Sequence, residues 1–220
     1  MLQDGDKGVI IQRDKKTYAI APHIPCGVVS PGTLRKLADI AEKYKLAALK
    51  ITSAERIALV GINEEDVDPI WADLGMAPGA AIGLCVRSVK SCPGTTFCKR
   101  AFQDSLSLGM KLDSIYHGME LPGKFKMGVS GCPNQCAETC IKDLGYVGMP
   151  KGWKVMVGGN GGGIARLSKE LVKDITTEQA LEIAKKVIDW FKANARPHQR
   201  LGQILEKLPI EEFRKAILGS

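Results

Sequence analysis

The chain has 220 residues, of which 45% are hydrophobic and 25% are charged, and this composition is typical of a globular protein with an apolar core. Its apolar runs are too short to span a bilayer, and the polar, acidic start of the chain is unlike a secretory signal, so we expect a cytoplasmic protein. The formal net charge of +7 favours anionic partners, whereas the dispersed basic residues and the aromatic content of 5% argue against a nucleic-acid-binding protein.

The first 78 residues begin with the pattern of a small α+β unit. Residues 8–21 predict a hairpin, because β-branched and aromatic residues flank the polar turn Asp14-Lys15-Lys16. Ser30-Pro31 predicts the start of a helix that runs to about Lys45, since Ser is a common N-cap and Pro is tolerated at the first helical position.

Two short apolar runs, 47–52 and 57–62, then predict a pair of strands joined by a tight connection. Asn63 predicts the cap of a helix that ends at Gly75. The order of these elements resembles a ferredoxin-like α+β half-domain over residues 1–78, with a domain boundary at Pro78-Gly79.

Residues 79–220 predict a second, mixed α/β domain. A strand is expected over 83–89, a loop over 91–96, and a helix over 97–108 that Gly109 ends. After the stretch 124–136, the remaining expected elements are strands at 146–148 and 154–157, a glycine run at 158–163, an amphipathic helix from Thr177, and helices at 199–208 and 210–218.

The most informative stretch is 124–136. Lys124 and Lys126 are spaced at the two-residue period of a strand, so both ammonium groups should leave one face. Cys132 and Cys136 follow in a loop. Two cations and two thiols so close in sequence indicate chemistry rather than packing.

The seven cysteines are an odd number in a chain without an export signal, which favours metal or redox use over disulfides. Five residues separate Cys92 from Cys98, and three separate Cys132 from Cys136. The wider gap argues against a zinc finger, and neither pair has the C-x-x-C form of a redox dithiol. Four thiolates in two pairs suffice for an iron–sulfur cluster. The other cysteines, which we expect to pack as small apolar residues, are Cys26, Cys85 and Cys140.

Cys92-Pro93-Gly94-Thr95-Thr96-Phe97-Cys98, followed by Gly131-Cys132-Pro133-Asn134-Gln135-Cys136, resembles the siroheme and iron–sulfur signature of the sulfite and nitrite reductase family. Residues 31–61 are similar to the ferredoxin-like half-domain of that family, and 157–166 to its glycine-rich segment. Large members contain two copies of this module. This chain has one copy, and so it resembles the small, single-module branch of the family, that of the low-molecular-weight assimilatory-type sulfite reductases.

The resemblance implies a [4Fe–4S] cluster and a siroheme, bound within a domain over 79–220. The implied cluster ligands are Cys92, Cys98, Cys132 and Cys136, and the sulfur of Cys136 would also bind the siroheme iron. The residues implied to bind the substrate anion are Lys124, Lys126, Arg56 and Arg87. The residues implied to hold siroheme, through its carboxylates or through close backbone approach, are Lys90, Lys99, Arg100, Asn134, Gly159, Asn160, Gly161, Gly162 and Arg166.

The activity implied is reduction of sulfite to sulfide, with electrons from an external donor protein because the chain has no flavin or nicotinamide motif. Reduction of nitrite to ammonia by the same site is the first alternative. A haem-free iron–sulfur electron carrier is the second, and a zinc-structured nucleic-acid module the third. Either one chain builds the whole site or two chains form a homodimer around it; we expect some homo-oligomer.

Overall fold

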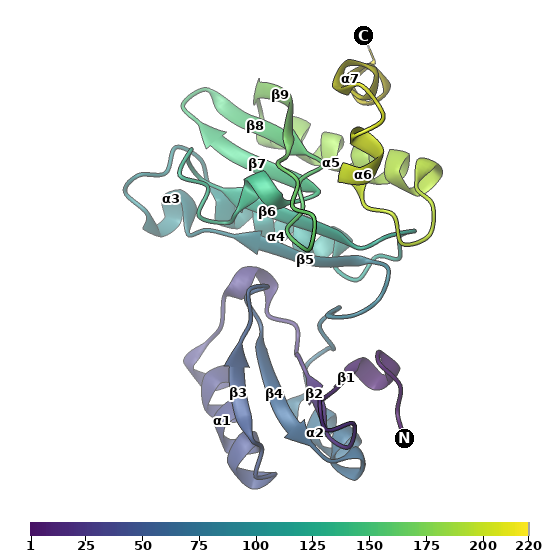
Figure 1. Cartoon of the computed structure of the whole chain (residues 1–220). Coiled ribbons are helices and arrows are strands. Elements are labelled where there is room, and N and C mark those ends of the chain that lie inside the picture. The colour runs from purple at the N-terminus through teal and green to yellow at the C-terminus, as the bar shows by residue number, and fades with distance from the viewer. Residues whose placement is uncertain (220) are drawn as a thin grey trace. The chain divides into compact units, whose positions relative to one another are not determined.

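The computed structural model describes residues 1–219, which form two compact units that divide between Gly83 and Leu84. Figure 1 traces the chain through both units. None of the described helices is long and apolar enough to cross a membrane.

The first unit is a four-stranded antiparallel sheet, of order β1-β2-β4-β3, with two α-helices. Its elements are η1 (Asp6–Gly8), β1 (Val9–Ile11), β2 (Tyr18–Ile20), η2 (Pro25–Gly27), α1 (Pro31–Lys43), β3 (Ala48–Ile51), β4 (Ile57–Ile62), η3 (Glu64–Asp66) and α2 (Val67–Leu74). The predicted hairpin, strand pair and two helices are therefore confirmed.

Local sequence signals explain where the helices of this unit begin and end. The hydroxyl of Ser30 accepts a hydrogen bond of 3.0 Å from the amide of Thr33, as an N-cap should. Gly75 ends α2 in the left-handed conformation, with φ of 56°. Asn63 precedes η3 rather than α2, and it makes no side-chain cap hydrogen bond.

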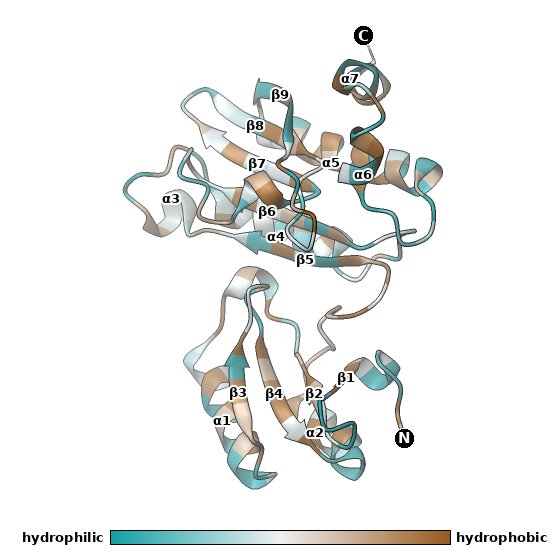
Figure 2. Cartoon of the chain, in the orientation of Figure 1, coloured by the Kyte–Doolittle hydropathy of each residue, from teal (hydrophilic) through white to brown (hydrophobic). Residues whose placement is uncertain are grey.

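The core of the first unit lies between its sheet and its helices. In Figure 2, β4 is largely brown, as expected for a strand that lies against the core, and the C-terminal end of α1 is teal because its last residues are charged. The core residues are Val9, Tyr18, Ile20, Leu37, Ile40, Leu59, Ile62, Val67, Ile70 and Leu74.

The second unit is built on a five-stranded mixed sheet of order β5-β6-β7-β8-β9. β5, β6 and β7 are parallel neighbours, and β8 and β9 continue the sheet in antiparallel fashion. Its elements are β5 (Val86–Ser91), α3 (Gly94–Phe97), α4 (Ser105–Tyr116), β6 (Phe125–Ser130), η4 (Thr139–Ile141), β7 (Leu144–Met149), β8 (Gly152–Val157), β9 (Lys169–Ile175), α5 (Thr177–Asn194), α6 (Leu201–Leu205) and α7 (Ile210–Leu218).

Helices α4 and α5 cover one face of this sheet (Figure 1). Phe125 of β6 packs on Phe191 of α5 with ring centroids 5.3 Å apart. The apolar face predicted for α5 is confirmed, because all six of its predicted core residues are buried: Ala180, Ile183, Ala184, Val187, Ile188 and Phe191. The face of β6 that carries Lys126 is turned away from these helices.

Several of the elements expected in the second unit have other bounds in the structure. The stretch 91–96 is not all loop, since α3 begins at Gly94, and β5 extends to Ser91 instead of ending at 89. No single helix covers 97–108; α3 ends at Phe97, and α4 begins at Ser105, because the carboxylate of Asp104 caps it by accepting from the amide of Ser107. Gly109 lies buried inside α4 and does not end it. Strand β9 has no counterpart among the expected elements.

Candidate active site and cofactor-binding region

The carboxyl ends of β5 and β6 bring the first cysteine of each pair to the same edge of the sheet. Cys92 directly follows β5, and Cys132 lies two residues beyond β6. The amide of Cys92 donates to the carbonyl of Val129 at 3.1 Å, which continues the parallel pairing past β5. The Sγ of Cys92 accepts from the amide of Gly131 at 3.1 Å, which ties the first cysteine loop to the turn after β6.

The two cysteine-bearing loops pack directly on each other. The amides of Phe102 and Gln103 both donate to the carbonyl of Gly131, at 2.7 and 3.1 Å. A Cβ on Gly131 would lie 3.0 Å from the Cα of Gly94, so glycine is needed for this approach. The fold therefore joins the segment from Cys92 to Cys98 to the segment that begins at Cys132.

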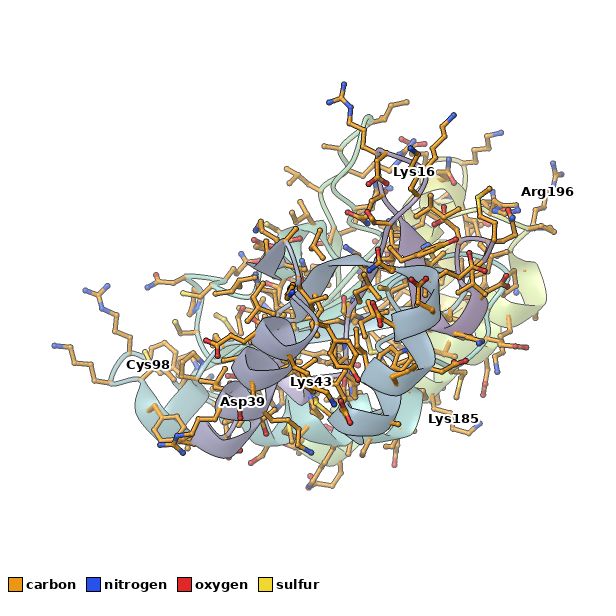
Figure 3. All side chains as sticks on the ribbon, turned by 90° about the horizontal axis from the view of Figure 1, so that it is seen from below. Lys16, Asp39, Lys43, Cys98, Lys185 and Arg196 are labelled. Carbon is orange, nitrogen blue, oxygen red and sulfur yellow. The ribbon has the colours of Figure 1, made fainter. Side chains whose placement is uncertain are left out.

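The thiols themselves are not gathered into a coordination shell. Within residues 1–219, no group of three or more His, Cys, Asp or Glu side chains is arranged to hold a metal ion. Cys136 is exposed, and Cys98 lies at the periphery of the molecule in Figure 3. Four thiols on two adjoining loops nevertheless fit a thiolate-bound cluster in donor type.

The segment that follows Cys136 packs closely over the sheet face opposite to α4 and α5. Three glycines permit the approach: a Cβ on Gly128 would lie 3.0 Å from the carbonyl oxygen of Ala137, one on Gly145 2.6 Å from that of Thr139, and one on Gly159 2.6 Å from that of Cys140. Because these obstacles are backbone atoms, the sheet fixes the position of segment 137–143.

The lysines singled out in the sequence lie near the other end of β6, Lys124 just before the strand and Lys126 within it. Lys126 is partly buried, and its pKa is lowered from 10.5 to about 8, first by burial and then by the neighbouring cations Lys124, Lys142, Arg200 and Arg87. Burial also lowers the pKa of Lys124, helped by Arg87 and Arg200. These five residues form a cationic cluster on one unit of the protein.

Two members of the cationic cluster, Lys142 and Arg200, were not found from the sequence. Lys142 is buried, and its Nζ lies 3.0 Å from a carboxylate oxygen of Glu138. Arg200 makes a two-point contact with the wholly buried carboxylate of Asp143, with N–O distances of 3.0 and 2.6 Å. Neither residue belongs to a local motif, since both reach the cluster through long-range packing.

Arg87 belongs to the cationic cluster, and burial lowers the pKa of its guanidinium; its predicted role in binding the anion stays a prediction. Arg56 belongs to the other compact unit, where it is buried in the turn between β3 and β4. The role predicted for Arg56 at the anion site therefore stays a prediction.

Two of the basic residues predicted to hold siroheme carboxylates already contact carboxylates of the chain. Lys90 lies 3.4 Å from Glu138, and Arg166 contacts both carboxylate oxygens of Glu206 at 2.8 and 3.0 Å. The two glutamates are about half exposed. These contacts show that both cations are placed to bind carboxylates.

The predicted glycine-rich segment is tightly packed at one end and open at the other. Gly159 touches the backbone of segment 137–143, whereas a Cβ on Gly162 would meet nothing within 4 Å. Asn160 donates to the carbonyl of Ile164, and its buried Oδ1 has no hydrogen-bond partner among the described residues. The other predicted siroheme contacts are exposed or half-buried at the surface: Lys99, Arg100, Asn134 and Gly161.

The residues present fit a polycarboxylate cofactor. The cationic cluster contains one buried anion, Asp143, against five cations, so a ligand rich in carboxylates would offset the excess charge. Asn160 leaves one buried acceptor for a donor of the ligand or for water. The positions of the individual ligand groups stay predictions.

Comparison with known protein families matches both units. Residues 10–77 match the nitrite/sulfite reductase ferredoxin-like half domain, and residues 82–220 match the nitrite and sulphite reductase 4Fe-4S domain. These matches confirm the predicted fold class and the family resemblance.

Relatives and solved structures agree with the family matches. The chain is 41% identical to an assimilatory-type sulfite reductase of Nitratidesulfovibrio vulgaris, covering 99% of this chain and 100% of that protein. It is 40% identical to a nitrite reductase [NAD(P)H] of Bacillus subtilis, but covers only 26% of that protein. The fold matches that of the Mycobacterium tuberculosis NirA protein, with a TM-score of 0.83, 19% identity, and coverage of 99% of this chain and 47% of the other.

Proposed function

The chain belongs to the nitrite and sulphite reductase family, and we propose that it reduces sulfite to sulfide at a siroheme coupled to a [4Fe–4S] cluster. The family is one of siroheme and iron–sulfur oxidoreductases. When bound, the cluster would pass on electrons from the external donor, and siroheme would supply the iron at which the anion is reduced.

The observation that carries the proposal is the cationic cluster around Lys126. A small anion entering this surface meets Lys124, Lys126 and Arg87, which compensate its charge and polarise its oxygens. Each oxygen that leaves sulfite departs as water and needs protons. With a pKa of about 8, Lys126 is an ammonium that can give up its proton near neutral pH, whereas an ordinary lysine holds its proton more tightly.

The proposal assigns cluster binding to Cys92, Cys98, Cys132 and Cys136, and a shared contact with siroheme iron to Cys136. Two adjoining loops at one sheet edge support the assignment of these thiols. Lys90 and Arg166, each already in contact with a carboxylate, would bind siroheme carboxylates in exchange for Glu138 and Glu206.

Sulfite is favoured over nitrite by the extent of the similarity. The sulfite reductase relative is matched over its whole length, whereas this chain corresponds to about a quarter of the nitrite reductase relative. Reduction of nitrite to ammonia is the second candidate, because the identity to that relative is nearly as high, at 40%.

An external donor protein, a cytoplasmic location and a homo-oligomeric assembly are further parts of the proposal. The seven cysteines, all among the described residues, form no disulfide with one another, which supports a reducing compartment. The internal two-fold symmetry expected of large family members would be supplied here by a second copy of the chain.

The test is an anaerobic assay of the purified holoenzyme with a reduced viologen dye, with sulfide and ammonia measured as products. We expect siroheme and cluster absorption, sulfide from sulfite, and slower conversion of nitrite. Lys126→Met should slow sulfite turnover by about 10²-fold while the spectrum is unchanged. Lys173→Met, which removes an exposed lysine of β9, is the matched control. A colourless protein, or a coloured one that makes no sulfide, would contradict the proposal.

A further inference from the structure

Asp143 is a wholly buried carboxylate immediately before β7, and its hydrogen bonds connect β6 to the C-terminal part of the chain. One of its oxygens accepts a hydrogen bond of 2.7 Å from the backbone amide of Lys126. Both oxygens accept from the guanidinium of Arg200, at 3.0 and 2.6 Å. Lys126 and Arg200 are thus joined by hydrogen bonds to a single carboxylate.

The segment that carries Arg200 is seated on the turn that leads into β6. The amide of His198 donates to the carbonyl of Pro122 at 2.8 Å. Gly123 touches the backbone carbonyl of Gln199 so closely that no Cβ would fit between them. The amide of Arg200 is held by Gln203 at 2.8 Å, at the start of α6. Arg200 therefore approaches Asp143 from a fixed backbone.

We propose that Asp143 and Arg200 are a positioning pair for Lys126, which fixes the backbone of this lysine and balances the charge around its ammonium. The C-terminal segment 196–205 thereby becomes part of the reductase site. Neither residue touches the substrate in this scheme. The inference rests on the proposed function only in giving Lys126 a role in anion reduction.

In this scheme the charges of Asp143 and Arg200 also affect the pKa of Lys126, so their role is not only to hold the backbone in place. The cations that face Lys126 are Lys124 from just before β6, Lys142 from segment 137–143, Arg87 from β5 and Arg200 from the C-terminal segment. The anions are Asp143 beneath its backbone amide and Glu138, which contacts Lys142. Arg200 lowers the pKa of Lys124 and of Lys126, whereas Asp143 raises that of Lys124.

Removing one member of the pair leaves the charge of the other uncompensated. Arg200→Gln removes a cation, so the pKa of Lys126 should rise. Asp143→Asn keeps the shape and the acceptor for the Lys126 amide but removes the anion, so the charge of Arg200 should lower the pKa of Lys126. Gaining or losing one charge as close to Lys126 as this pair should shift the pKa of Lys126 by about half a unit to one unit. A merely structural pair would not give shifts of opposite sign.

The experiment measures the pKa of Lys126 directly in the holoenzyme. Competitive acetylation with acetic anhydride, followed across pH by mass spectrometry of individual lysines, reports the neutral fraction of each amine. We expect the midpoint for Lys126 to rise in Arg200→Gln, to fall in Asp143→Asn, and to return toward the wild-type value in Arg200→Lys. Lys173 in the same samples should keep one midpoint throughout.

Arg196→Gln is the matched control, because it removes a cation four residues away whose side chain points outward from the ribbon in Figure 3. It should leave the midpoint of Lys126 unchanged. The inference is overturned if the midpoint in Asp143→Asn does not lie below that in Arg200→Gln, or if Arg196→Gln shifts it as far as Arg200→Gln does.

The pH dependence of kcat/KM for sulfite, measured on the same variants, separates this inference from the proposed function. If the acetylation midpoint of Lys126 shifts in opposite directions in the two variants and the pH profile of kcat/KM follows, both the positioning pair and the role of Lys126 in the reaction are supported. Opposite acetylation shifts with an unmoved kinetic profile would keep the positioning pair and remove Lys126 from the reaction.

Discussion

Replacing Gly145 with Ala tests whether segment 137–143 is fixed on the sheet as the structure shows. A Cβ on this residue of β7 would lie 2.6 Å from the carbonyl oxygen of Thr139 and 3.0 Å from the Thr139 Cβ. Both distances are well inside ordinary contact. Because the nearest obstacle is backbone, a side-chain rotation cannot relieve it, and either the strand or segment 137–143 must move.

The expected cost follows from overpacking a close contact, about 1–3 kcal/mol. For a chain of this length, each kcal/mol lowers Tm by roughly 2–4 °C, so Gly145→Ala should melt roughly 2–12 °C below the wild type. The displaced segment also carries Lys142 and Glu138, so the KM for sulfite should rise in the same variant.

Gly163→Ala is the matched control, since a Cβ there meets nothing within 4 Å. Its stability should change by no more than about 0.5 kcal/mol. The assay is thermal unfolding of both variants followed by circular dichroism, with KM measured on the holoenzymes. Equal melting temperatures for Gly145→Ala and Gly163→Ala would show that the carbonyl of Thr139 does not lie against the sheet, and the placement of segment 137–143 would have to be abandoned.

Three further predictions concern the site itself. The kcat/KM for sulfite should fall as pH rises through about 8, because Lys126 is an ammonium below its pKa and a neutral amine above it. Bound cofactor carboxylates would move the midpoint of this fall to higher pH. The variant Lys126→Arg should abolish the fall, because arginine stays charged over this pH range. Cys136→Ser should lose the spectroscopic coupling between siroheme and cluster while Cys140→Ser keeps it, and equal loss in both would remove Cys136 from the bridging position. Lys142→Met should raise the pKa of Lys126 and weaken sulfite binding, as seen in KM and in the acetylation midpoint; an unchanged midpoint would place Lys142 outside the cationic cluster.

Elements with strong local signals could be predicted from the sequence. The helix after Ser30 begins at a recognisable N-cap residue, and the buried face of α5 is visible in the sequence as apolar residues at helical spacing. The strand at Lys126 was found from a two-residue alternation. In each case the information lies within a few residues, so tertiary contacts only reinforce it.

Elements that depend on distant contacts were missed. Gly109 looked like a helix end, but α4 is set by the cap at Asp104 and by burial of the glycine itself. Arg200 and Asp143 are 57 residues apart, and no pattern in the sequence predicts that they form a pair. Their contact exists only because the turn before β6 and the C-terminal segment dock together.

The family resemblance implies that the lysines face the substrate and the cysteines face the cluster, although the spacing of these residues alone does not show this division. Lys126 and Cys132 are six residues apart and looked like members of one crowded centre. In the structure β6 is extended from Phe125 to Ser130, so the four residues from Lys126 to the end of the strand span about 13 Å, and Cys132 lies beyond that.

A lysine side chain cannot bridge such a distance, so in the proposed site the cations and the thiols of this stretch would act at opposite ends of the bound cofactors. Segment 137–143 strengthens this division, because it returns from the cysteine end and places Lys142 among the cations next to Lys126. Strand β6 therefore works as a rigid spacer, and the glycines beside it keep segment 137–143 close to the sheet. A change in the length of β6 should uncouple anion binding from electron supply even where every predicted ligand is retained.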